Sequence, residues 1–166
     1  RGDLPRARAL YEEALAMRRA LNEPGGMSAT LRSLGVLAAA QGNWDEARRY
    51  LRESLDLKKV QGVSRGRTFC ELGSVLLRDP DGDRTQARNL LQTALDIARQ
   101  YNVHYDEANA LDWLGALDLA QGDLAGARIQ WEAALKIYTD LGAAAASATR
   151  ARLAKLGAPA PVAATA

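Results

Sequence analysis

The sequence predicts an all-α fold, an α-solenoid in which antiparallel helix pairs stack side by side, and three observations lead to it. A Gly followed five residues later by Ala-Arg recurs at a constant spacing, at Gly2, Gly42, Gly82 and Gly122. After each Gly, bulky and small residues recur three and four positions apart, which is the period of a helix. The chain is 48% hydrophobic but only 5% aromatic, so its core is expected to consist mainly of Leu and Ala.

The helices that follow the repeated Gly, here called B helices, are expected to pack closely on their neighbours. In the second copy Ala47 and Ser54 are small enough for two backbones to approach, and Leu51 between them fills the remaining space. Gly or Asn then ends each copy, since both residues adopt the left-handed conformation that closes helices. B helices are predicted at about 3–21, 43–61, 83–101 and 123–141.

A second set, here called A helices, lies between the B helices. A bulky residue three positions before a Leu-Gly pair marks each of them, and the Gly residues are Gly35, Gly73 and Gly115. Gly inside a helix costs about 1 kcal/mol relative to Ala, so its recurrence indicates a close crossing where a Cβ would clash. A helices are predicted at about 28–41, 65–78 and 105–121, followed by a capping helix at 143–156 and a disordered Ala/Pro-rich tail at 157–166.

The order of these residues resembles the tetratricopeptide repeat (TPR) family. The last repeat carries the pattern in the sequence Leu111, Leu114-Gly115, Gly122, Ala127, Trp131 and Ala134. The resemblance implies a right-handed superhelix over residues 1–156, made of an unpaired helix 3–21, repeats 28–61, 65–101 and 105–141, and the cap. The period of 40 exceeds the 34 residues usual in the family, and the excess is expected in the connections from B to A helices. This long-period form is similar to arrays in bacterial signal-transduction ATPases and large transcription activators.

Composition and motifs argue against catalysis and against several classes of ligand. The chain has one His and one Cys, and it lacks the Gly-rich phosphate loop and the Gly-x-Ser-x-Gly turn of common enzymes. A net charge of +2 is too small to indicate nucleic-acid binding, and no run approaches the roughly 20 apolar residues of a membrane span. We therefore expect a cytoplasmic protein that is not an enzyme, binds neither nucleic acid nor membranes, and needs no cofactor or metal.

The resemblance also implies that the A helices line a concave groove that contacts a ligand. The positions carried over from the family share one A-helix face and alternate in charge: Arg32, Arg67, Cys70, Glu71, Arg78, Asn109, Asp112 and Trp113. Mixed charge with one aromatic side chain suits an extended or helical peptide. The Lys/Asn clamp of chaperone adaptors is not reproduced, since Val36, Glu71 and Trp113 occupy the positions where Asn, Asn and Arg are expected.

Two functions remain open at this stage. The first is a non-catalytic scaffold module that binds a protein or peptide, as a piece of a larger bacterial regulatory protein. The second is a sensory module that binds a small molecule and signals to an attached ATPase or DNA-binding domain. Helix 3–21 lacks an A partner, so Leu10, Tyr11 and Leu15 are expected to lie uncovered and to mediate self-association. The repeated arginines, such as Arg48 and Arg88, are expected to pack their stems and keep their charged groups in solvent.

Overall fold

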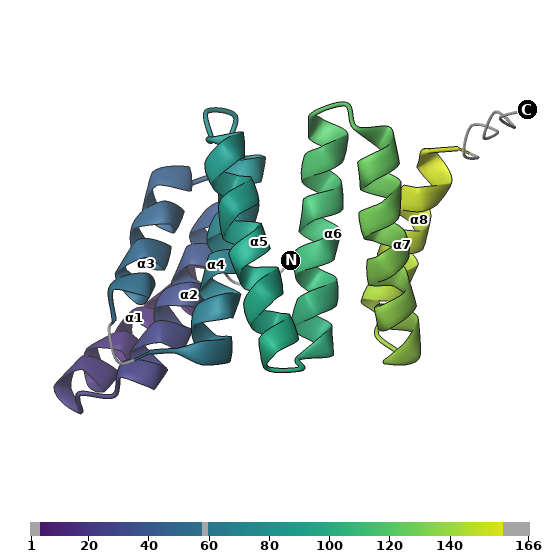
Figure 1. The fold of residues 1–166 in the computed structure, drawn as a ribbon. Helices are drawn as coiled ribbons and strands as arrows, with labels where there is room; N and C mark the ends of the chain where they lie inside the picture. The colour runs from purple at the N-terminus through teal and green to yellow at the C-terminus, as the bar shows by residue number, and fades with distance from the viewer. Residues whose placement is uncertain (1–3, 58–59, 158–166) are drawn as a thin grey trace, which may run out of the picture.

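The predicted all-α class is confirmed by the structure, a computed structural model that describes residues 4–57 and 60–157. These residues form a row of helices without strands, and consecutive helices run in opposite directions (Figure 1). The helices are Leu4–Ala20 (α1), Pro24–Ala40 (α2), Trp44–Asp56 (α3), Gly62–Arg78 (α4), Arg84–Gln100 (α5), His104–Ala120 (α6), Leu124–Asp140 (α7) and Ala145–Lys155 (α8). The predicted tail falls mostly on residues 158–166, which lie outside the described part of the chain.

From α5 to α7 the long repeat period comes from the helices rather than from the connections, which corrects the sequence-based expectation for these helices. Helix α3 differs: it ends at Asp56, short of the predicted residue 61, and five residues separate it from α4. Helices α5, α6 and α7 each have 17 residues and are joined by the three-residue connections 101–103 and 121–123. One helix with one connection therefore takes 20 residues, and a pair takes 40. Helices α2 and α4 also begin earlier than the predicted residues 28 and 65, at Pro24 and Gly62. Pro24 lies in the first turn of α2, where proline is tolerated because its missing N–H would have no helical partner.

The Gly residues of the A helices allow the close crossing that their recurrence predicted. A Cβ placed on Gly73 would lie 2.7 Å from Cγ of Leu91, and a Cβ on Gly35 would lie 2.7 Å from Cγ of Leu51. Gly115 makes the same approach to Trp131, with 2.7 Å to Cδ1. The bulky B-helix residues therefore fill the place that an A-helix side chain would need, and each pair buries its apolar face in this way.

The array curves with its A helices on the inner side. Helix α2 contacts α4 and α4 contacts α6, whereas no contact of similar extent joins α3 to α5 or α5 to α7 in the described ranges. Successive A helices thus lie nearer to one another than successive B helices do. We call the exposed surface of α2, α4 and α6 the A-helix face.

Helix α1 is the least covered B helix. Tyr11 is 38% exposed, although the equivalent Leu51 and Leu91 are fully buried, because no A helix with a matching Gly covers it in the described residues. Leu10 is also exposed, but Leu15 is buried against Leu31 and neighbours from α2 and α3, so the expectation that Leu15 is uncovered is wrong. Within the described ranges no helix is both long enough and apolar enough to cross a lipid bilayer.

Candidate functional site

A pocket of about 250 Å³ opens on the A-helix face between α4 and α6. Helix α5 supplies an apolar wall through Ala94, Ile97 and Ala98, and α2 contributes one residue. Five of the groove residues expected from the sequence come together here: Arg32, Arg67, Cys70, Glu71 and Asn109. The pocket also contains residues outside that set, chiefly Val63, Tyr105 and Asp106.

Four charged side chains line this pocket, two basic and two acidic. Arg67 donates a hydrogen bond from Nε to Oδ2 of Asp106 at 2.7 Å, which joins α4 to α6. The remaining two, Arg32 and Glu71, are near enough to influence each other's ionisation, but no ion pair within 4 Å joins them among the described residues. The pocket therefore contains one satisfied pair and two charged groups without a direct partner of opposite charge.

Arg32 is the most unusual polar residue of the site. Its Nη1 atom is buried and has no hydrogen-bond partner in the described part of the chain. Burial lowers the pKa of Arg32, and the nearby positive charge of Arg67 lowers it further. A buried N–H without a partner costs about 1–3 kcal/mol. An acceptor group from a ligand would recover that cost.

Glu71 is the second charged residue of the pocket whose charged form is disfavoured by burial. Burial raises the pKa of Glu71, and the charges of Arg32 and Arg78 oppose this shift only in part. The carboxylate is thus held where water solvates it poorly, which favours any ligand that can donate a hydrogen bond to it.

Cys70 forms part of the wall and is not a reactive thiol. Burial raises the pKa of Cys70, followed by the influence of nearby Glu71 and Asp106. Nδ2 of Asn109 donates to Sγ of Cys70 at 3.5 Å. A protonated, buried thiol is a poor nucleophile. No group of three or more His, Cys, Asp or Glu side chains suited to a metal ion occurs in the residues that the structure describes.

Two of the expected groove residues lie together away from the pocket. The guanidinium of Arg78 lies 5.6 Å from the ring centroid of Trp113 on α6 and 5.8 Å from that of Trp44 on α3. Such cation–π contacts stabilise by about 0.5–1 kcal/mol at exposed sites. Arg78 and Trp113 therefore form a contact between repeats, with Trp44 as its third member.

Asp112 does not belong to the open face, which corrects its assignment to the groove. Its carboxylate accepts a hydrogen bond from Oγ1 of Thr149 at 3.0 Å and also pairs with Arg152, and both partners are on α8. The residue is 8% exposed. Asp112 thus anchors the capping helix to α6, a role that the sequence could not indicate without knowing where α8 packs.

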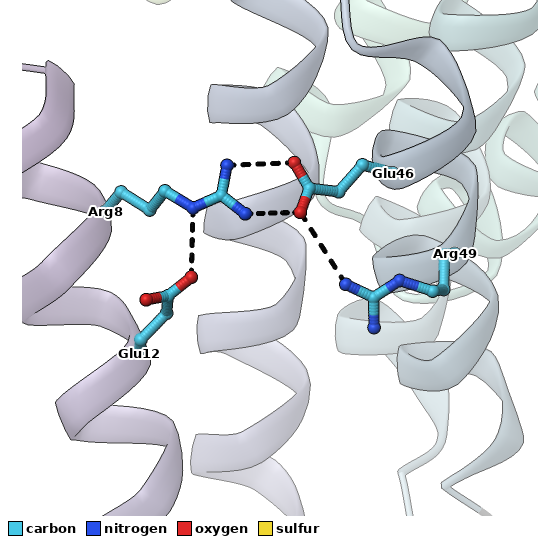
Figure 2. Close-up of polar contacts among 4 residues, drawn as sticks. All are labelled: Arg8, Glu12, Glu46 and Arg49. Carbon is cyan, nitrogen blue, oxygen red and sulfur yellow. Dashed lines mark hydrogen bonds and ion pairs between the residues drawn. The ribbon is translucent and has the colours of Figure 1, made fainter.

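The repeated arginines are ion-paired, contrary to the expectation that their charged groups extend into solvent. Arg8 on α1 makes a two-pronged contact with Glu46 on α3 and also donates from Nε to Glu12 at 2.9 Å (Figure 2). Figure 2 also shows Arg49, at 3.7 Å from the same Glu46 carboxylate. These residues join successive B helices.

The next two arginines of the series reach the ends of A helices. Arg48 pairs with Asp79, which follows the last residue of α4, and Arg88 donates to Oδ1 of Asp118 near the end of α6 at 2.5 Å. Both carboxylates are buried. The signal for these pairs is present in the sequence, because an acidic residue lies 30 or 31 positions after each arginine.

A second hollow of about 310 Å³ adjoins the pocket at Arg32 and extends toward α1. Its lining is mostly apolar and includes Tyr11, Val36 and Leu37. Val36 is 40% exposed. The A-helix face therefore carries a charged pocket and an apolar hollow side by side, with Arg32 between them.

Comparison with known proteins agrees with this architecture. The model of the tetratricopeptide repeat family matches residues 1–59 and 64–140. The crystal structure of BtubC (BKLC) from P. vanneervenii is similar to this chain with a TM-score of 0.75 and 19% sequence identity, over 94% of this chain and 66% of that chain. At this identity the likeness shows the fold alone. A search of curated proteins gave no match.

Proposed function

Since this chain belongs to the tetratricopeptide repeat family, whose members generally act as scaffolds that bind proteins or peptides, we propose that its A-helix face binds an extended segment of a partner protein. The module is non-catalytic in this proposal. Its ligand follows the face from the hollow beside α1 to the pocket between α4 and α6.

The observation that carries the proposal is the position of Arg32. Arg32 lines both the charged pocket and the apolar hollow beside it, and its buried Nη1 atom has no hydrogen-bond partner in the described residues. A bound peptide can place a polar side chain in the charged pocket and an apolar side chain in the hollow, because successive residues of an extended peptide are about 3.3 Å apart. The adjacent polar and apolar subsites thus suit a peptide.

The size of the charged pocket suits one side chain of a peptide better than a drug-sized molecule. Sites for small molecules usually have volumes of about 300–1,000 Å³; the apolar hollow has about 310 Å³ and the charged pocket about 250 Å³. A pocket of this size suits one side chain or a very small metabolite. The sensory alternative remains a measurable outcome, since a metabolite that binds the folded state would raise its thermal stability.

The setting is proposed from the likeness of the long repeats to arrays in bacterial regulators. We place the module in the cytoplasm, as part of a larger signalling or transcription-regulating protein. Affinity capture with the module from a bacterial extract, followed by identification of its partners, tests this setting.

The binding proposal is tested with a random peptide library displayed on phage. Selected peptides are measured by isothermal titration calorimetry against the wild-type chain, Arg32→Ala, Val36→Asp and the control Arg52→Ala, whose side chain is exposed on α3. We expect the two A-helix variants to weaken binding by at least about tenfold, equivalent to about 1.4 kcal/mol, and the control to bind as the wild type does. Failure to select any peptide, or equal binding by all variants, would contradict the proposal.

A further inference from the structure

We propose that the pocket between α4 and α6 recognises the side-chain carboxamide of a Gln or Asn residue in the bound peptide. Arg32 donates to the carboxamide oxygen, and Glu71 accepts from its NH₂ group. The inference rests on the proposed peptide binding and specifies which residue of the peptide enters the pocket.

The first step in the argument is the balance of charge. Arg32 and Arg67 contribute two positive charges to the lining, and Glu71 and Asp106 contribute two negative ones. Arg67 and Asp106 satisfy each other at 2.7 Å. Arg32 retains a buried N–H without a partner, and Glu71 has no ion pair within 4 Å in the described residues. The pocket therefore offers one donor and one acceptor at no net charge.

The second step excludes charged ligand groups. A carboxylate would be attracted by Arg32 but repelled by Glu71 and Asp106, which line the same small space. An ammonium group would be attracted by Glu71 but repelled by Arg32 and Arg67. Since Arg32 and Glu71 are both partly removed from water, their effects on a charged group are stronger than in bulk water, and a neutral group that combines an acceptor with a donor is favoured.

The third step identifies that group. A carboxamide has an oxygen that accepts and an NH₂ group that donates, joined by one carbon atom. It can therefore bridge a guanidinium and a carboxylate that do not contact each other directly. The apolar wall of Ala94, Ile97 and Ala98 on α5 suits the methylene groups that carry the carboxamide, and Tyr105, which is 52% exposed, lies in the same lining.

The test uses capped pentapeptides that differ only at a central residue, Gln, Glu, Lys or Ala, flanked by alanines. Binding is followed by ¹H–¹⁵N correlation spectra of the full chain, with backbone signals around Arg32, Cys70 and Asn109 reporting on the pocket. We expect the Gln peptide to bind at least about tenfold more tightly than the Glu and Lys peptides, which corresponds to about 1.4 kcal/mol.

Two conservative variants give a readout that a merely structural role would not produce. Glu71→Gln leaves the pocket with a net positive charge, so the preference should change to the Glu peptide. Arg32→Gln leaves a net negative charge, so the preference should change to the Lys peptide. Arg52→Gln on α3 serves as the matched control and should retain the preference for Gln. Circular dichroism confirms that each variant is folded.

Each outcome decides the inference. Equal binding of the Gln, Glu and Lys peptides, unchanged preference in the variants, or no shift in pocket signals at millimolar peptide would overturn it. Equally tight binding of free glutamine would also overturn it, since the pocket would then take a small solute. If selected library peptides bind through Val36 without shifting the backbone signals of the pocket, the proposed function stands and only this inference is removed. If no library peptide binds either, both the proposed function and this inference are removed.

Discussion

The crossing of α4 and α5 provides a quantitative test of how helix pairs hold together. We predict that Gly73→Ala destabilises the protein, although Ala is the better helix former. The added Cβ would lie 2.7 Å from Cγ of Leu91 and 3.2 Å from the backbone oxygen of Ala87. Leu91 is fully buried, so it has no space into which it can move.

The magnitude follows from two opposing effects. Overpacking a core costs about 1–3 kcal/mol, and replacing Gly with Ala in a helix recovers about 1 kcal/mol. We expect a net loss of about 1–2 kcal/mol, because one of the close atoms belongs to the backbone. Gly25→Ala in α2 is the matched control: nothing lies within 4 Å of its added Cβ, so it should gain up to about 1 kcal/mol.

The assay is equilibrium unfolding in urea, followed by far-UV circular dichroism. A second background checks the cause: Leu91→Ala removes the obstructing side chain at its own cost of about 2–5 kcal/mol. Gly73→Ala added to it should cost less than in the wild type, since only the 3.2 Å contact with the backbone oxygen of Ala87 remains. If Gly73→Ala were as stable as the wild type, or if its effect persisted unchanged in the Leu91→Ala background, the proposed close crossing would be refuted.

Three further predictions concern the ion pairs and α1. Asp118→Asn should lower the free energy of unfolding by about 1 kcal/mol, because Arg88 loses a charged partner, and an unchanged urea midpoint would refute this. Hydrogen bonds from Arg8 lower the pKa of Glu46. The pair therefore contributes stability above the ordinary Glu pKa of about 4.3, and this contribution is lost as pH falls through the folded-state pKa. In urea titrations at several pH values, Arg8→Met should lose less stability on acidification than the wild type does. Self-association through the exposed Leu10 should appear as a mass that rises with concentration in sedimentation equilibrium and is abolished by Leu10→Lys; a monomer at all concentrations would contradict it.

The fold was predictable because the same contact occurs in every repeat. Gly35 and Leu51, Gly73 and Leu91, and Gly115 and Trp131 each bring one A helix onto one B helix, so the constant spacing in the sequence records a constant spacing in space. Helix starts were less predictable. Gly and Pro at the start of α2 suggest a loop by composition, but the first turn of a helix tolerates both residues.

The site was predictable in part, for a physical reason. Arg32, Arg67, Cys70, Glu71 and Asn109 occupy A-helix positions that face inward, so the helical period places them together. Asp112 occupies an equivalent position, but α8 packs over it, and the sequence does not specify where a terminal helix docks. An acidic residue 30 or 31 positions after Arg48 and Arg88 is the sequence signal for their pairs with Asp79 and Asp118, but that spacing gains its meaning only once the contact between helices is known.

A substitution at Arg32 tests most directly whether the A-helix face binds a partner or whether this arginine only supports the fold. Its buried N–H has no partner, so Arg32→Met, which retains the stem and removes the charge, is the variant to measure for both urea stability and affinity for a selected peptide. If the A-helix face binds a partner, the variant will be more stable than the wild type by up to about 1–3 kcal/mol and will bind the peptide at least about tenfold more weakly. A variant that is less stable and binds with unchanged affinity would show that Arg32 supports the fold and that the ligand lies elsewhere.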